Sequence, residues 1–245
     1  NGVRDYLSAH FKQVADIDLS GYENWEPIGK NVDGKRFAGI YDGNGYAISN
    51  LTIERSTTDY VGLFCTIKFA VLKNIKLVNT NVKGQWYVGG LVGWIWGRNS
   101  VINCSSVGDV SGYRYVGGLV GASNTADTAY GLFGCCVAGN VSGTAIVGAL
   151  IGSSEQGTVI VDCYSYSTTV YGESRIGGLV GLLTNTSHMI NCYSTGSVSG
   201  IYFIGGLVGL KSTSPPFSTV TSSYYDSETS GCSDTGKGEP RTTAE

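Results

Sequence analysis

The chain has 245 residues, of which 37 are glycine and four are proline, and 42% are hydrophobic while only 14% are charged. Its net charge of −3 excludes the Lys and Arg surplus that a nucleic-acid or anionic-membrane partner requires. The apolar content argues against disorder, and no apolar run reaches the roughly 18 to 20 residues of a membrane-spanning helix. We expect a soluble segment with a substantial core, in which the glycine excess has a structural cause.

The first sixty residues precede the clear repeats. Residues 6–14 are the one stretch whose pattern could support a helix, and nine of the 19 acidic residues fall within residues 1–59. We expect residues 1–60 to form an N-terminal cap and lead-in coils, because an uncovered end of a sheet stack invites pairing with other chains.

Paired carboxylates in this segment raise the possibility of an enzyme. β-Rods that cut polysaccharides can place acids on one outward face, and Asp16 and Asp18 could face each other across the first coil, with Glu26 or Asp42 nearby. Only five acids fall within residues 60–225, at different positions of the repeat, so they build no acidic cluster there. We favour solubilising cap residues and expect no catalytic residue. A polysaccharide-acting hydrolase or lyase, or its accessory domain, is the alternative.

A six-residue motif of the form Val-Gly-Gly-Leu-Val-Gly recurs through the rest of the chain. Copies occupy residues 88–93, 116–121, 147–152, 176–181 and 204–209, after a partial copy at 61–64. They start 27 to 31 residues apart, which is short for the roughly 40 residues of a propeller blade. The flanking stretches are rich in β-branched and small residues. We therefore predict an all-β, right-handed parallel β-solenoid of about eight coils, with a repeat of about 28 residues.

A second series, mostly asparagine, keeps step with the motif. Its members are Asn50, Asn74, Asn103, Asp162 and Asn191. Stacked on successive coils, these residues could form an inward ladder that satisfies buried backbone groups. We expect the Gly-Gly pair of the motif to supply positive φ and close backbone approach at a corner, and the Leu-Val pair to fill the coil interior.

Four of the seven cysteines share one position of the repeat. They are Cys104, Cys135, Cys163 and Cys192, separated by 31, 28 and 29 residues. Disulfide frameworks use shorter, irregular spacings, and side chains in a parallel ladder point the same way, so buried free thiols are favoured. Zinc is a weaker alternative because paired short-range ligands are missing, and we expect neither a metal nor a cofactor.

The candidate ligand-binding residues lie just before the motif copies. If the first motif residue points inward, the preceding one points outward, and aromatic residues with an occasional arginine recur there. Such a column could dock a sugar ring or a protein, or could merely stabilise the rod by ring stacking. Trp94 and Trp96 could extend the column or fill a corner. The predicted site residues are Tyr60, Trp86, Tyr87, Arg114, Tyr115, Arg175, Tyr202 and Phe203.

The Gly-Gly-Leu-Val-Gly copies resemble the GLUG-motif repeat family of bacterial surface and secreted proteins. Residues 15–19, 25–29 and 37–53 are similar to the lead-in of such repeats, and residues 225–231 and 242–245 to their exit. The resemblance covers nearly the whole chain and carries no catalytic residues. It implies an adhesin-like or filamentous surface protein, or a region beside a secreted peptidase or glycan-acting enzyme, with further domains in a larger parent chain.

The sequence therefore predicts one solenoid over residues 1–231, with repeat coils over 61–231. A polar tail over residues 232–245 is expected to pack on the end or remain loose. We expect a non-catalytic binding or adhesion module, extracellular or on the bacterial cell surface, with a glycan or a host or cell-surface protein as partner. A passive spacer in a longer fibre is a third possibility. No nucleic-acid partner and no membrane insertion are expected.

Overall fold

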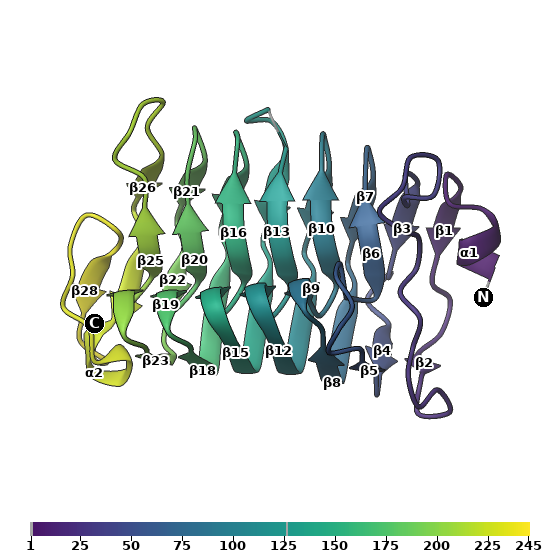
Figure 1. The fold of residues 1–245 in the computed structure, drawn as a ribbon, viewed down its shortest axis with the longest axis horizontal. Helices are drawn as coiled ribbons and strands as arrows, with labels where there is room; N and C mark the ends of the chain where they lie inside the picture. Colours follow the sequence, from purple (N-terminus) through teal and green to yellow (C-terminus); the bar gives the residue numbers. More distant parts are fainter. Residues whose placement is uncertain (1, 126) are drawn as a thin grey trace.

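The protein forms a parallel β-solenoid in which successive coils stack along one axis (Figure 1). The computed structural model describes residues 2–125 and 127–245. Its eight-stranded sheet spans seven coil intervals of 28 to 31 residues each. The predicted all-β parallel solenoid is confirmed, with about seven turns where about eight were expected.

Three sheets form the walls of the rod, and their strands pair in parallel. Sheet A contains β1 (His10–Lys12), β3 (Ile40–Asp42), β7 (Val71–Lys73), β11 (Ser100–Ile102), β14 (Gly131–Phe133), β17 (Val159–Val161), β21 (His188–Ile190) and β26 (Thr219–Thr221). Sheet B contains β2 (Ile17–Asp18), β4 (Ala47–Ser49), β5 (Thr52–Glu54), β8 (Lys76–Lys83), β9 (Trp86–Gly89), β12 (Ser105–Gly117), β15 (Cys136–Gly148), β18 (Tyr164–Tyr171), β19 (Ser174–Gly177), β22 (Tyr193–Ser194), β23 (Ser197–Ser199), β24 (Tyr202–Gly205), β27 (Tyr224–Asp226) and β28 (Glu239–Arg241). Sheet C contains β6 (Phe64–Ile67), β10 (Val92–Trp96), β13 (Val120–Asn124), β16 (Ile151–Glu155), β20 (Val180–Leu183) and β25 (Val208–Lys211).

The motif leucines fill the interior of the coils, as predicted. Each of them is completely buried, as is the apolar residue that follows it. Burial of one such side chain contributes about 1.5 to 3 kcal/mol, so the stacked interior is the main source of stability. The leucines are Leu91, Leu119, Leu150, Leu179 and Leu207.

The asparagine series does not form the predicted inward ladder. Its five members all adopt left-handed backbone with φ between 50° and 61°, and none of their side chains is buried. Asn and Asp tolerate this conformation better than other non-glycine residues do. Gly134 takes the same position, with φ 61°, in the coil that lacks an Asn. A left-handed turn before sheet B therefore explains Asn74, Asn103, Asp162 and Asn191. Asn50 lies instead within sheet B, between β4 and β5, where its Oδ1 accepts a hydrogen bond from Asn79 Nδ2 at 2.6 Å.

A completely buried amide that bonds backbone groups lies at a different corner, between sheets C and A. Asn99 is completely buried, and its Oδ1 accepts a hydrogen bond from Ala70 N at 2.8 Å. Its Nδ2 donates to Trp96 O at 2.9 Å and to Gly97 O at 2.8 Å. Only this coil carries Asn at the position, so no repeating pattern marks it in the sequence.

The cysteine column is confirmed as a stack of buried free thiols. Each of the four Sγ atoms donates to the carbonyl oxygen two residues earlier, at distances of 3.2 to 3.4 Å. Burial raises the pKa of Cys104 and of Cys163 well above the ordinary value. Those two thiols therefore stay protonated, and all four cysteines act as small buried side chains that also satisfy carbonyl groups.

The helices are short and lie at the two ends of the rod (Figure 1). They are α1 (Gly2–Asp5) and α2 (Ser227–Ser230). The helix considered for residues 6–14 is wrong, because β1 lies within that stretch and pairs with β3. Pairing at the sheet edge outweighs local helix preference here. Neither helix of the described chain has the length and hydropathy needed to cross a bilayer.

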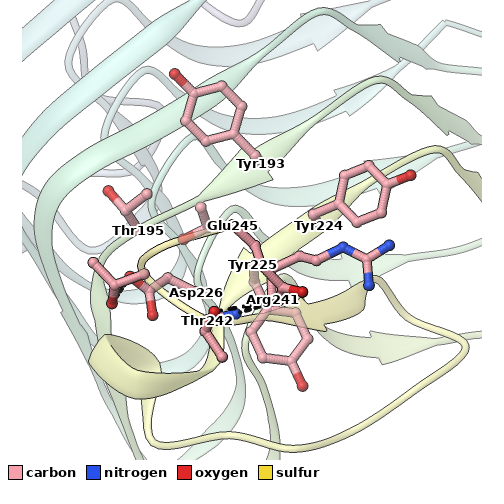
Figure 2. Close-up of a pocket in the computed structure, with 10 residues that line it drawn as sticks. Tyr193, Thr195, Tyr224, Tyr225, Asp226, Arg241, Thr242 and Glu245 are labelled. Carbon is pink, nitrogen blue, oxygen red and sulfur yellow. Dashed lines mark hydrogen bonds between the residues drawn. The ribbon is translucent and has the colours of Figure 1, made fainter.

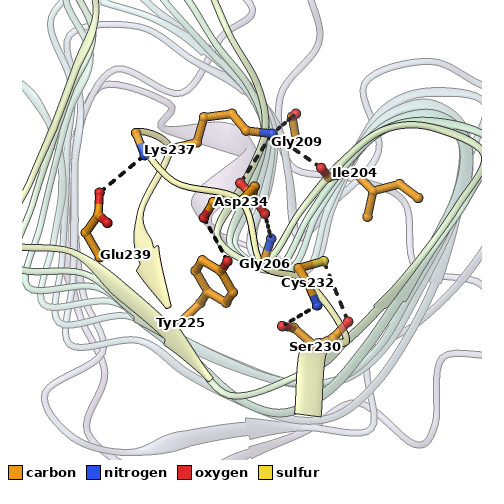
Figure 3. Close-up of polar contacts among 10 residues, drawn as sticks. Ile204, Gly206, Gly209, Tyr225, Ser230, Cys232, Asp234, Lys237 and Glu239 are labelled. Carbon is orange, nitrogen blue, oxygen red and sulfur yellow. Dashed lines mark hydrogen bonds and ion pairs between the residues drawn. The ribbon is translucent and has the colours of Figure 1, made fainter. Parts of the chain in front are cut away.

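The polar tail closes the C-terminal end of the rod (Figure 3). Lys237 Nζ donates to Ile204 O at 3.3 Å and to Gly209 O at 3.0 Å, and it lies 3.4 Å from the Asp234 carboxylate. Asp234 in turn accepts from Gly206 N at 3.1 Å. The tail then adds β28 to sheet B beside β27. Backbone groups of the last coil thus find partners within the chain.

Candidate ligand-binding face

The predicted residues gather at one corner of the rod, where sheet B meets the motif that leads into sheet C. In each of the six coils that carry a motif copy, the residue before the motif has left-handed φ between 55° and 60°. This conformation costs a bulky side chain about 1 to 2 kcal/mol. We call this set the corner column. Its members are Tyr60, Tyr87, Tyr115, Ile146, Arg175 and Phe203.

Glycines of the neighbouring coil make room for the corner column. A Cβ atom on Gly121 would lie 2.6 Å from the carbonyl carbon of Tyr87, and one on Gly152 would lie 2.7 Å from that of Tyr115. The close approach predicted for the Gly-Gly pair is confirmed as well, because a Cβ on Gly117 would lie 2.7 Å from Ile151 Cα and one on Gly118 would lie closer still to Ala149 O. The predicted positive φ at Gly-Gly is wrong, because positive φ falls on the column residue before the motif.

The three tyrosines of the column stack on one another. The ring centroids of Tyr60 and Tyr87 are 4.8 Å apart with 2° between the ring planes, and those of Tyr87 and Tyr115 are 4.6 Å apart with 3°. These distances match the spacing of adjacent strands. Burial, together with the neighbouring hydroxyls, raises the pKa of Tyr87 to about 12. Both faces of Tyr87 are covered, so only its edge and hydroxyl face outward.

Two tryptophans extend this aromatic surface over sheet C. The Trp94 centroid lies 5.6 Å from that of Tyr60 and 5.8 Å from that of Tyr87. Trp96 stacks on Trp94 at 5.1 Å, and the Arg36 guanidinium lies 4.4 Å from the Trp96 ring centroid. Trp94 and Trp96 thus continue the surface rather than fill a corner.

Trp86 and Arg114 flank the tyrosine stack on the sheet-B side. They are Cα partners on adjacent strands, β9 and β12. The Arg114 guanidinium lies 4.8 Å from the ring centroid of Tyr115 and 5.7 Å from that of Trp86. Five of the eight predicted residues therefore form one cluster in the N-terminal half of the rod.

The other three predicted residues form a separate group near the C-terminal end. Arg175 lies 5.7 Å from the Phe203 ring centroid, and the buried Ile146 separates Arg175 from the tyrosine stack. Tyr202 is 63% exposed and Phe203 is 55% exposed. The preceding Ile201 is 65% exposed. Here the column ends in aromatic surface that no further coil covers.

A second tyrosine column on the outer face of sheet B was missed by the sequence analysis. Cys136, Tyr164, Tyr193 and Tyr224 are successive Cα partners, and the rings of Tyr164 and Tyr193 stack at 4.9 Å with 6° between planes. The adjacent Cys136 thiol raises the pKa of Tyr164 to about 12. A signal was present in the sequence, because each member follows directly after the buried residue that precedes its sheet-B strand.

This second column ends at a pocket of about 360 Å³ (Figure 2). In Figure 2 the rings of Tyr193 and Tyr224 rise from neighbouring strands, and the Arg241 guanidinium lies 4.7 Å from the Tyr224 centroid. The Asp226 carboxylate below them caps α2 by accepting from Thr229 N at 3.1 Å. It also accepts from Thr243 Oγ1 at 2.8 Å. This carboxylate therefore links α2 to the polar tail at residues 232–245.

Three of the four acids considered for catalysis, Asp16, Asp18 and Asp42, serve as hydrogen-bond acceptors in the lead-in coils. Asp18 accepts from Asn50 Nδ2 at 2.8 Å, and Asp42 accepts from Asn74 Nδ2 at 3.0 Å. These bonds lower the pKa of both carboxyl groups, whereas a general acid needs a raised one. Asp16 accepts from a backbone amide. Within residues 2–125 and 127–245, no three His, Cys, Asp or Glu side chains are grouped to hold a metal.

Comparison with known proteins shows which repeat this is. The model of the GLUG motif matches residues 84–111 and 172–199. A crystal structure of a protein named as an immunoglobulin A1 protease of Bacteroides ovatus has a TM-score of 0.79 with 21% identity, covering 98% of this chain and 81% of that one. At this identity the likeness concerns the fold.

Three curated relatives share parts of the sequence. A protein of Evansella cellulosilytica named as a Gly-rich membrane protein is 33% identical over 350 residues, covering all of this chain and 40% of the relative. Halomucin of Haloquadratum walsbyi is 38% identical over 125 residues, which are 48% of this chain and 1% of halomucin. The immunoglobulin A1 protease of Streptococcus sanguinis is 26% identical over 218 residues, which are 85% of this chain and 11% of the protease. The chain spans less than half the length of each relative.

Proposed function

Because the chain belongs to the GLUG-motif repeat family, we propose that it is a non-catalytic extracellular binding module that presents its aromatic corner to a glycan or protein ligand. The observation that carries this proposal is the exposed run Ile201, Tyr202 and Phe203, in which each residue is more than half exposed. Contiguous apolar surface of this kind marks interaction sites in soluble proteins.

The covered faces of the tyrosine stack restrict where a ligand can lie. A sugar ring stacks on the flat face of an aromatic side chain, and neither face of Tyr87 is open. The Arg175 guanidinium lies 5.7 Å from the Phe203 ring centroid, and Phe203 is 55% exposed. The ligand therefore contacts the end of the corner column, and the tyrosine stack holds the coils in register behind it.

A location outside the cell is part of this proposal. Relatives named as a membrane protein and as halomucin support it, as does the likeness to a protein named as a protease of immunoglobulin A1. In the longer relatives a module of this kind would hold its neighbours against the ligand.

The test is a screen of the chain on glycan and host-protein arrays, followed by variants at the column end. Tyr202→Ser with Phe203→Ser should weaken binding of any captured ligand at least about tenfold, because both exposed rings are lost. Phe217→Ser is the control, since Phe217 is 60% exposed and lies outside the column. Circular dichroism should be unchanged in both. Full binding by the double variant would contradict the proposal.

A passive spacer is the second candidate, and the mutual stacking of Tyr60, Tyr87 and Tyr115 favours it. In that case the rings serve only the rod. No ligand would be captured on either array, and Tyr87→Ala would lower the free energy of unfolding without any other effect.

A further inference from the structure

A groove at the N-terminal end of the rod has a charge opposite to that of the whole molecule. It has a volume of about 710 Å³, within the range of about 300 to 1,000 Å³ typical of small-ligand sites. It lies between the end of α1 with the segment that follows it, the loop at residues 33–36 and the turn from β6 to β7. Its charged lining residues are Arg4, Lys35, Arg36 and Lys68 against Asp5 and Asp33. The cationic excess stands out in a chain whose net charge is −3.

The basic side chains are held in place by specific contacts. Arg36 Nη2 donates to Asn31 Oδ1 at 3.0 Å, and the Arg36 guanidinium also rests on the Trp96 ring. Lys68 Nζ lies 3.5 Å from Asp33 Oδ1 and 5.5 Å from the Phe69 ring centroid. The hydrogen bond from Arg36, helped by Lys68, lowers the pKa of Asp33, so one carboxylate is shared between two cations. Positive charge therefore remains in the groove.

Two aromatic side chains of the groove are open to solvent. Tyr6 is 67% exposed and Phe69 is 61% exposed. Phe69 has left-handed φ of 59°, and the nearest atom to a Cβ built on Gly97 would be Phe69 Cε1, at 3.6 Å. The turn thus holds the Phe69 ring outward next to Lys68. The groove therefore places exposed aromatic rings directly beside basic side chains, a combination that suits a ligand with both an apolar face and an acidic group.

We infer that this groove binds an acidic polysaccharide, one whose pyranose rings carry carboxylate or sulfate groups. The C–H face of a pyranose packs on Phe69 or Tyr6, and its acid group takes a charge-assisted hydrogen bond from Lys68 or from the exposed Lys35. A neutral glycan leaves the cations unused, and an acidic peptide leaves the rings unused. The site is distinct from the end of the corner column and stands independently of it.

The experiment is calorimetric titration of the full chain with heparin-derived and polygalacturonate-derived tetrasaccharides, and with a neutral galactan tetrasaccharide. An acidic probe should bind with an affinity that falls as NaCl rises, and the neutral probe should not bind. Lys35→Gln with Lys68→Gln should weaken binding at least about tenfold, while Lys68→Arg should retain it. Phe69→Ser should also weaken it.

Lys76→Gln is the matched control, because Lys76 is exposed on sheet B away from the groove. Tyr202→Ser with Phe203→Ser should leave acidic-glycan binding unchanged, which separates this site from the proposed function. Equal binding of the neutral probe, or unchanged binding by the double lysine variant, would overturn the inference. It would also be overturned if a poly-glutamate peptide bound as tightly as the tetrasaccharides and Phe69→Ser had no effect, because the occupant would then be a peptide.

Discussion

Tyr87 and the other members of the corner column hold a backbone conformation that usually belongs to glycine. The glycine that makes this possible lies one coil away, where its missing Cβ lets the two backbones meet. The corner thus depends on two residues of adjacent coils: the column residue adopts the left-handed φ, and the glycine of the next coil leaves room for its backbone. The side chain at the column position is free to vary, and tyrosine, isoleucine, arginine and phenylalanine all occur there.

Replacement of Gly121 by alanine tests whether this close approach is needed. The added Cβ would lie 2.6 Å from the backbone of Tyr87, so the coils would have to separate. We expect the free energy of unfolding to fall by about 1 to 3 kcal/mol or more, measured by urea denaturation. Gly21→Ala is the control, because nothing lies within 4 Å of its added Cβ. Equal stability of the two variants would show that the close approach at Gly121 is unimportant.

Some elements could be predicted from the sequence because they repeat. The motif leucines and the cysteine column recur about every 28 to 31 residues. In a parallel stack, residues one repeat apart lie directly above one another and share the same environment. The continuous 13-residue strands β12 and β15 could not be predicted, since both run through residues whose backbone bends around a corner. The left-handed column residues were equally hidden, because contact with the next coil overrides local preference at a bulky residue. The basic groove was missed because the 33–36 loop follows no repeat.

The polar tail at residues 232–245 is an element whose contribution to stability can be measured. Lys237 donates two hydrogen bonds to the last coil and forms an ion pair with Asp234 within the tail, and its side chain is 23% exposed. Lys237→Met should lower the free energy of unfolding by about 1 to 3 kcal/mol. It should also cause concentration-dependent association, detectable by light scattering, because backbone groups at the end become available. Lys76→Met is the control, and identical behaviour of the two variants would rule out this role for the tail.

The tyrosines give the whole molecule a pH dependence in the alkaline range. Burial raises the pKa of Tyr87 to about 12, above the ordinary value of 10.0, and Tyr164 is shifted to about 12 as well. The fold therefore favours the neutral hydroxyls. Their contribution to stability is complete below about pH 10 and is lost as the pH rises from 10 towards 12.

Urea unfolding at pH 9 and at pH 11 tests this dependence. The native protein should lose stability between these values, and Tyr87→Phe should lose less, because it keeps the ring stack but has no hydroxyl to ionise. Tyr6→Phe, which changes an exposed ring outside the stack, should behave like the native protein. An equal loss in all three proteins would assign the effect to other groups.

The stacking of coils along a single axis has a mechanical consequence. Inter-coil hydrogen bonds run along the rod, and the two ends of the chain lie at its opposite ends (Figure 1). A pull on the ends loads the bonds of one coil at a time, so the rod should peel stepwise under low force. Each detached coil of 28 to 31 residues would release about 90 to 110 Å of extended chain. Under tension the protein would therefore lengthen in nearly equal steps and dissipate the applied load, and its coils would refold when the load falls.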